Sequence, residues 1–447
     1  RYDYDFKLQN YTESKLKTQI ERVSNDSYLK VFQNNLFPSP VIPKSKNTLA
    51  TKIDLDIKNN DYSLSTGFQI FEDLGKRNND RYQYVLPYYN YSRSYVPSNN
   101  LGTFNLYFTG NNKLTNTNNL TTTSVNDLNY ESFDYFTNKG FKNNFGVYVK
   151  NINTIAKNNS KYKNSLQVNE MSMFEFKSAL PMSKTNSESY NLFTPKISVR
   201  VNPQNNMKNH KNSNKIITAN NVFDINRLGL SDDFETGKSL TFGLDYKIET
   251  IKKNQNEKIK NKYLEFKLAT VIRDQNEKNI PISSTINKKN SDIFGSINNN
   301  LSENININYN FSLDNDMRTL NSNSIESKIS INNFVTSFNF IEQRNEIGST
   351  HLLSNTTEYK VNNNSSLRFS TRRNKEINLT EYYDLSYEYK NDCLTAALKF
   401  NKTFYKDNDL IPTEDLFFSI TLIPLTTYER AIYKKTPGQS GIKGWFR

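Results

Sequence analysis

The chain has 447 residues, of which 35% are hydrophobic and 13% aromatic, and its formal net charge is +13. A disordered chain would be poor in aromatic residues, so 28 Tyr and 29 Phe argue against disorder. No apolar run approaches the ~18 residues that a transmembrane helix needs. The low mean hydropathy of -0.77 argues against an ordinary soluble core and suits a fold with one apolar face and one wet face.

The positive charge has two readings, which are solvated surface side chains and attraction to an anionic partner. The 58 Lys and Arg residues are spread along the whole chain and form no single basic block. A nucleic-acid-binding protein would instead show a basic patch with a recognisable motif. We therefore expect no nucleic-acid partner.

Apolar and polar residues alternate with a period of two in many segments, which predicts β-strands with two different faces. In chain order, the clearest apolar positions are Leu49, Ile53, Leu55 and Ile57; Tyr62, Leu64, Phe68 and Ile70; Leu240, Phe242, Leu244, Tyr246 and Ile248; and Ile305, Ile307, Tyr309, Phe311 and Leu313. The residues between them are mostly charged, small or Asn.

Strands of ~9–11 residues with one apolar and one polar face are typical of membrane-spanning β-strands. A soluble sandwich would alternate too, but its strands are nearer ~5–6 residues. The sequence therefore predicts an all-β fold, a large antiparallel transmembrane β-barrel of the outer-membrane type with ~20 strands in this chain. We assign residues 1–424 to the barrel and 425–447 to a basic, flexible C-terminal tail.

Short turns alternate with longer loops in the C-terminal half, which is the outer-membrane barrel pattern. Short turns are predicted at Asn332–Asn333, 362–364 and Asn391–Asp392, because Asn and Asp tolerate positive φ angles. Longer loops are predicted near 315–322, 342–352, 374–379 and 406–413. Two segments rich in Asn, Lys and Ser, 151–164 and 204–220, are interpreted as long surface loops or disordered segments.

The sequence offers little for catalysis. His210 and His351 lie in Asn- and Ser-rich surroundings, and neither has a metal-ligand spacing. No nucleophile-elbow or phosphate-loop glycine pattern occurs. We predict no catalytic residue, no metal site and no cofactor, and a protein that is not an enzyme.

The single cysteine, Cys393, follows the predicted Asn391–Asp392 turn. The alternation after it places Leu394 and Leu398 on the apolar face, so Cys393 is expected to face inward at the periplasmic rim. It is either a buried thiol without further role or, in an oxidising compartment, the partner of a cysteine outside this chain.

Residues 221–243 resemble a stretch of the LptD family, the lipopolysaccharide-assembly proteins, and of its alphaproteobacterial branch in particular. Segments 84–87, 192–203 and 387–393 are also similar to that family, so the resemblance spans roughly residues 1–424. The residues that carry the main motif are Phe223, Asn226, Arg227, Gly229, Asp232, Glu235, Gly237 and Gly243.

The resemblance implies an outer-membrane protein of a Gram-negative bacterium that places lipopolysaccharide in the outer leaflet. It implies three protein or lipid partners besides lipopolysaccharide: an LptE-like plug lipoprotein, a periplasmic bridge component that reaches an N-terminal jelly roll, and the outer-membrane lipids. The jelly roll and first barrel strands are expected to be absent from this chain, which would make the barrel incomplete. Cys393 resembles the family's C-terminal cysteine, which bonds to the N-terminal region.

The segment 415–424 is predicted to be the last strand and one edge of a lateral gate for lipid release. Its apolar residues are Leu416, Phe417, Phe418, Ile420 and Leu422. Three other interpretations stay open: a different barrel such as a porin or nutrient receptor, an Asn-rich soluble β adhesin or binding protein, and, with least support, an enzyme.

Overall fold

The structure of the chain is a computed structural model. The structure describes residues 2–29, 43, 45, 47–76, 78–97, 101–160, 162–204, 207–250, 262–300, 304–404, 412–422 and 426–435. These residues contain 24 β-strands in one sheet and two short 3-10 helices, η1 (Asn78–Arg81) and η2 (Ile282–Ser284). None of the helices in them is long and apolar enough to cross a membrane. The all-β prediction is confirmed, with more strands than expected.

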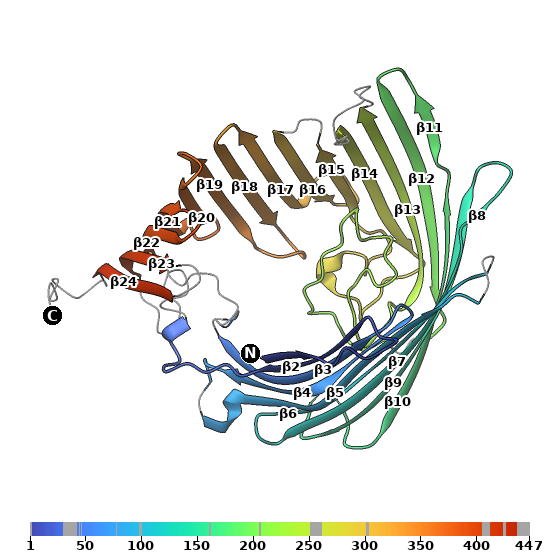
Figure 1. The fold of residues 1–447 in the computed structure, drawn as a ribbon. Coiled ribbons are helices and arrows are strands. Elements are labelled where there is room, and N and C mark those ends of the chain that lie inside the picture. Colours follow the sequence, from blue (N-terminus) through green and yellow to red (C-terminus); the bar gives the residue numbers. More distant parts are fainter. Residues whose placement is uncertain are drawn as a thin grey trace. The chain divides into compact units, whose positions relative to one another are not determined.

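Two compact units divide the chain. Unit 1 comprises residues 1–179, 198–209 and 229–240, and unit 2 comprises 180–197, 210–228 and 241–447. The strands of unit 1 are β1 (Tyr2–Asp5), β2 (Glu13–Gln19), β3 (Thr48–Lys58), β4 (Tyr62–Asp73), β5 (Tyr82–Tyr95), β6 (Gly102–Thr115), β7 (Asn119–Ser132), β8 (Tyr135–Phe136), β9 (Lys142–Lys157) and β10 (Gln167–Ala179). Figure 1 shows β2 to β10 following one another in blue to green.

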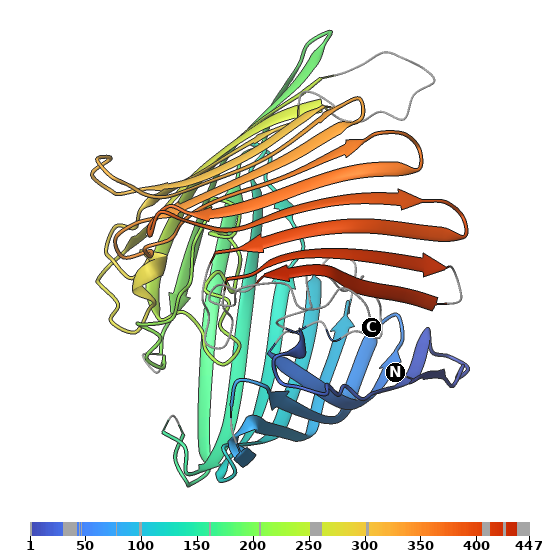
Figure 2. The ribbon, with the colours of Figure 1, turned by 90° about the vertical axis from the view of Figure 1, so that its left-hand side faces the viewer.

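The strands of unit 2 are β11 (Met182–Thr185), β14 (Lys262–Arg273), β15 (Ile293–Asn299), β16 (Ile305–Leu313), β17 (Leu320–Ile331), β18 (Phe334–Gln343), β19 (His351–Lys360), β20 (Ser365–Asn374), β21 (Leu379–Lys390), β22 (Leu394–Thr403), β23 (Glu414–Leu422) and β24 (Thr426–Lys435). Two strands, β12 (Ser189–Asn202) and β13 (Gly237–Thr250), have residues in both units. From β14 to β24 each strand pairs antiparallel with the next, and Figure 2 shows the later ones side by side in orange and red.

The two faces of the strands differ as the alternation predicted. On β9, Phe145 and Ile155 are exposed on one face, whereas Tyr148 and Ile152 are buried on the other. On β22, Leu398 is exposed, and its neighbour Ala397 is buried. The apolar exposed face is the one that suits lipid contact.

A bulge interrupts the ladders of β5. Its register with β6 shifts between Val85 and Tyr88, so Leu86 and Pro87 have no ladder partner on that side. Proline cannot donate a ladder hydrogen bond, and a bulge is one of the few places in a sheet that tolerate it. The segment 84–87 therefore lies within a strand.

The predicted short turns at Asn332–Asn333, 362–364 and Asn391–Asp392 are confirmed, since each joins two paired strands. Loops also lie where longer ones were expected, at 314–319, 344–350 and 375–378. Of the fourth predicted loop, residues 406–411 lie outside the described residues.

Three expectations are wrong in part. Residues 151–157 belong to β9, because their alternation of polar and apolar side chains continues the strand. The described part of 204–220 is not entirely at the surface, because Met207, Ile217 and Ala219 are buried. Residues 415–424 are not the last strand, because β24 pairs along the whole of β23. The predicted tail thus begins with a strand, and residues 436–447 lie outside the described residues.

Candidate functional site: a charged inner surface and the segment that covers it

A long connection, residues 203–236, joins β12 to β13 and is called the inner segment here. Its two ends, 203–209 and 229–236, belong to unit 1, and its middle, 210–228, belongs to unit 2. Buried residues occur in both ends and in the middle, for example Met207, Val222 and Asp233. The two ends therefore pack within unit 1, and the middle packs within unit 2.

A buried ion pair lies on the covered face of β10 and β12 in unit 1. Arg200 Nε donates to Glu175 Oε1 at 2.8 Å, and both side chains are almost fully buried. Ser198 Oγ donates to the same carboxylate oxygen at 2.9 Å, and Lys177 Nζ lies 3.0 Å from Oε2. These donors offset part of the desolvation cost of burying the carboxylate.

The neighbouring strand β9 contributes Lys150 to the same face. Its Nζ lies 2.7 Å from Asp127 Oδ2 on β7 and donates to the Ser231 backbone oxygen at 3.2 Å. The ammonium also lies 5.2 Å from the centroid of the Phe234 ring, in the range of a cation–π contact. Lys150 therefore connects the second end of the inner segment to strand β9.

The first end of the inner segment is held to the second by Lys208. The backbone N–H of Lys208 donates to Asp233 Oδ2 at 2.7 Å, and its Nζ lies 3.1 Å from Asp232 Oδ2. The Tyr162 hydroxyl donates to Asp232 as well, at 3.3 Å. Asp232 and Asp233 thus connect the two ends of the inner segment through Lys208.

In unit 2, the middle of the inner segment is fixed by Arg227. Its Nη1 donates to the Val222 backbone oxygen at 3.3 Å and to Thr241 Oγ1 of β13 at 3.0 Å. All three residues are buried. This arginine therefore closes a turn and anchors it to the strand that follows.

Phe223 of the motif lies against β12 and β13, where it contacts Lys196 and Gly243. A Cβ on Gly243 would fall 2.5 Å from Phe223 Cε2, so the ring occupies space that only glycine leaves open. Lys196 Nζ lies 4.3 Å from the centroid of the same ring and 2.7 Å from Asp245 Oδ2. The aromatic ring is therefore enclosed by a cation and a bare stretch of backbone.

Most residues of the predicted motif thus form contacts with other parts of the fold. Gly229 and Gly237 have positive φ angles of 59° and 81°, which glycine adopts without strain, and they flank the second end of the inner segment. Glu235 is buried, with Oε2 4.0 Å from Arg200 Nη1. Asn226 is exposed.

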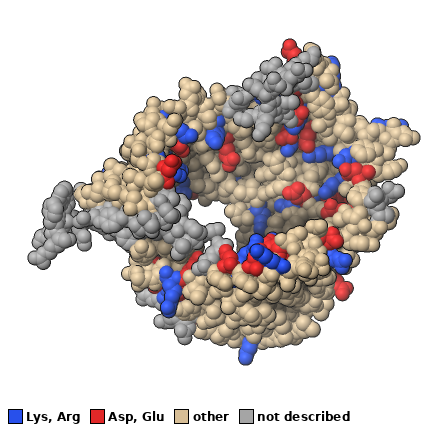
Figure 3. All heavy atoms as spheres, viewed as in Figure 1, with Lys and Arg blue, Asp and Glu red and all other residues tan. Residues whose placement is uncertain are grey.

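Sequence reasoning missed the strand partners of this site, which are Asp127, Lys150, Glu175 and Arg200. A usable signal was present, since these charges lie within otherwise apolar or alternating strands. Alternation assigns a residue to a face but does not reveal which charges meet across strands. Figure 3 shows Lys and Arg lying among Asp and Glu on the visible face, which is a mixed surface and not a patch of one sign.

The other predicted residues lie elsewhere in unit 2. On β23, Leu416, Phe418, Ile420 and Leu422 share one face, whereas Phe417 is buried on the opposite face. Cys393 is exposed in the turn before β22, where Asn391 Oδ1 accepts from its backbone N–H at 3.0 Å. Among the described residues, no cluster of His, Cys, Asp and Glu could hold a metal ion.

Long antiparallel strands with an exposed apolar face and an opposite face that carries charged residues define the class of outer-membrane β-barrel proteins. A model of the LptD family, described as LPS transport system D, matches residues 2–365. The chain belongs to the LptD family and is therefore an outer-membrane protein of Gram-negative bacteria that serves lipopolysaccharide transport.

The comparison with curated proteins found no match. Similar solved structures include a mutant ferric enterobactin receptor, PfeA of Pseudomonas aeruginosa, at 8% identity and a TM-score of 0.39, covering 85% of this chain and 72% of that one. The copper transporter OprC matches at 8% identity and a TM-score of 0.35, covering 93% and 72% of the two chains. Likenesses at this level do not assign a function.

Proposed function

We propose that this chain forms part of the wall through which lipopolysaccharide is assembled into the outer leaflet. The observation that carries the proposal is the two-faced sheet, in which an exposed apolar residue such as Leu398 lies on one face and a polar residue such as Lys399 on the other. Such a face solvates sugar and phosphate groups, while the apolar face meets the acyl chains of the bilayer. The transport involves no covalent chemistry.

Depletion of the full-length protein in its own bacterium tests the proposal. Lipopolysaccharide at the cell surface, measured by labelling intact cells, is expected to fall. Lipopolysaccharide on the periplasmic side of the outer membrane is expected to accumulate. Re-expression of the wild-type gene should restore the label. Unchanged surface lipopolysaccharide after depletion would contradict the proposal.

We further propose that the C-terminal edge of the sheet is one side of a lateral gate for the lipid. The prediction from sequence put this edge at β23, and the pairing with β24 moves it outward by one strand. Among the described residues β24 pairs with β23 alone, so its other edge offers backbone groups to a further strand or to an opening.

Photo-crosslinking tests the gate. A photoreactive amino acid at Leu422, which is exposed near the end of β23, should capture lipopolysaccharide during export. The same amino acid at Phe242, similarly exposed on β13 and ten strands before β23, is the matched control and should capture little. Equal capture at both positions would refute a gate at this edge.

Cys393 is proposed to form a disulfide with a cysteine outside this chain. Its exposed position in a turn supports this, since a partner can reach it without disturbing a strand. Cys393→Ser should abolish the mobility difference between oxidised and reduced full-length protein on a gel. Persistence of that difference would exclude Cys393.

An LptE-like plug lipoprotein and a periplasmic bridge component are proposed as protein partners, on the strength of family membership. Affinity purification of the full-length protein from outer membranes, followed by mass spectrometry, should recover a lipoprotein. The bridge component should be recovered in the same purification. Purification without either protein would remove them as partners.

A further inference from the structure

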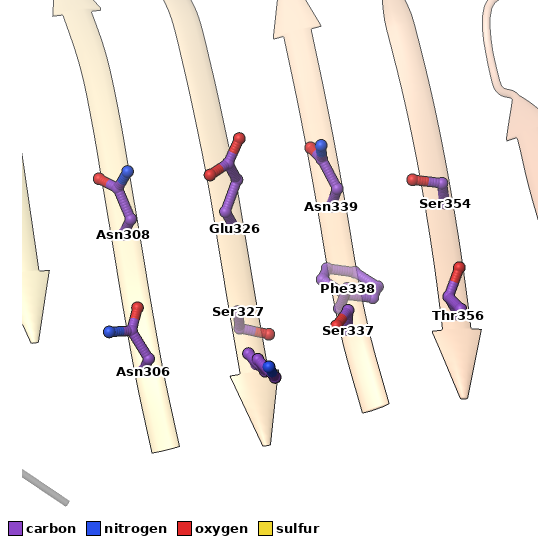
Figure 4. A pocket seen from close by; sticks show the side chains of 10 residues that line it. Asn306, Asn308, Glu326, Ser327, Ser337, Phe338, Asn339, Ser354 and Thr356 are labelled. Atoms are coloured by element: carbon purple, nitrogen blue, oxygen red, sulfur yellow. The ribbon is translucent and has the colours of Figure 1, made fainter. Parts of the chain in front are cut away.

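A polar groove of about 430 Å³ lies across β16, β17, β18 and β19 in unit 2. Its volume falls within the ~300–1,000 Å³ that small-molecule sites occupy. Figure 4 shows Asn308, Glu326, Asn339 and Ser354 lined up on the four adjacent strands. The groove lies outside the inner segment and its contacts, so the site described above does not include it.

Strand register explains why these side chains form one row. Asn308 pairs with Glu326, Glu326 with Asn339, and Asn339 with Ser354. Residues paired across strands point to the same face. Two residues further along, Lys328 and Thr356 lie in a second row on that face.

Three polar side chains of the groove lack partners within the described part of the chain, whereas Asn308 Oδ1 accepts from Asn310 at 3.2 Å and Asn306 donates to Asn300 at 3.4 Å. The side chains of Glu326, Asn339 and Ser354 make no hydrogen bond or ion pair with another described residue, and Asn339 Oδ1 is buried without a partner. By contrast, the nearby Asp292 carboxylate accepts from Ser312 at 2.7 Å and from Asn321 at 2.8 Å. A buried polar atom without a partner costs stability, so the groove is suited to a ligand that supplies the missing hydrogen bonds.

The lining identifies the chemistry of that ligand. Amide and hydroxyl groups both donate and accept hydrogen bonds, which matches the many hydroxyls of a sugar. The charged lining residues are one carboxylate, Glu326, and one ammonium, Lys328, so the groove has no surplus of cations for a phosphate. We propose that this groove binds a neutral segment of oligosaccharide, and this inference rests on the proposed function in lipopolysaccharide transport.

Calorimetry on the full-length protein in detergent tests the binding directly. The probe is the oligosaccharide released from purified lipopolysaccharide by mild acid and then dephosphorylated, and inorganic phosphate is the second probe. The oligosaccharide should bind and phosphate should not. Binding of phosphate alone, or of neither probe, would overturn the inference.

Two variants assign the binding to the groove. Asn339→Leu and Ser354→Val should each weaken oligosaccharide binding about tenfold, the loss expected for one hydrogen bond. Ser386→Val is the matched control, since Ser386 lies on the same face of β21 but outside the groove, and it should bind like the wild type. Each variant must first show the heat-modifiable gel shift of a folded barrel. Equal binding by all such folded variants would overturn the inference.

The two proposals fail separately. If depletion abolishes surface lipopolysaccharide but the purified protein binds no oligosaccharide, the groove assignment is wrong and the transport function stands. If the groove binds oligosaccharide and depletion leaves surface lipopolysaccharide unchanged, the transport function is wrong and the groove is a sugar site of another process.

Discussion

Arg200 and Glu175 form an ion pair at 2.8 Å beneath the inner segment, where both side chains are almost fully withdrawn from solvent. Their backbones belong to neighbouring strands, and the carboxylate also accepts from Ser198. The desolvation of the two charges is offset only while both partners remain. The pair therefore reports whether the inner segment is in place.

Glu175→Gln should destabilise the protein by about 3–5 kcal/mol, because it leaves the Arg200 guanidinium buried without a counter-charge. Urea unfolding in detergent, followed by fluorescence, measures the change. Replacing both residues by Met should recover part of the loss. The control is Lys402→Met at the more exposed Lys402–Glu414 pair, where about 0–1 kcal/mol is expected. Equal losses at both pairs would show that burial of the first pair is not important.

Gly243→Ala should destabilise the packing of the inner segment on unit 2. The new methyl group would lie 2.5 Å from Phe223 Cε2, and overpacking of this kind costs about 1–3 kcal/mol. Unfolding by urea gives the size of the effect. Adding Phe223→Leu should relieve the clash and recover stability, and failure of the double variant to do so would rule out the ring as the cause.

The loop between β16 and β17 should weaken in acid. Backbone N–H groups of Thr319 and Arg318 donate to the Asp314 carboxylate, and these hydrogen bonds lower the pKa of Asp314 below its ordinary value of 3.8. A lowered folded-state pKa contributes stability that is present above the unfolded value and is lost as pH falls through the folded value.

Amide hydrogen exchange at Arg318 and Thr319, corrected for intrinsic rates, should therefore show protection at pH 5 that decreases below pH ~3.8. Asp314→Asn keeps an acceptor oxygen but does not titrate, so its protection should not change over this range. The same pH profile in both proteins would contradict the assignment to Asp314.

The thiol of Cys393 should react quickly with a bulky maleimide once the full-length protein is reduced, because the residue is exposed in a turn. A cysteine introduced as Ala397→Cys in a Cys393→Ser background is the control, since Ala397 is buried four residues further along the chain, in β22. Mass spectrometry of the folded protein gives both rates. Similar rates would mean that the inner face of β22 is not covered.

Alternation and turn chemistry were enough to predict the wall. β13 covers the segment around Leu240 to Ile248, and the turn at Asn332–Asn333 lies as expected. Both follow from local physics, because strand period and positive φ angles are properties of a few adjacent residues.

The inner segment and β24 could not be predicted in this way. Residues 204–220 are rich in Asn, Lys and Ser, and their few apolar residues have no regular spacing, so composition suggested a solvated loop. Met207, Ile217 and Ala219 among them are nevertheless buried, and composition does not reveal the residues on which they pack. β24 has charged residues in the middle of its sequence, Glu429 and Arg430, and nevertheless pairs with β23.

The position of the inner segment also bears on the order in which unit 1 matures. Along the wall, neighbouring strands such as β6 and β7 meet through short hairpins. The contact between Lys150 Nζ and the Ser231 oxygen joins residues 81 positions apart. Closing so long a stretch of chain costs more entropy than closing a hairpin, and non-local contacts form more slowly than local ones. We therefore expect the hairpins to form before this contact does.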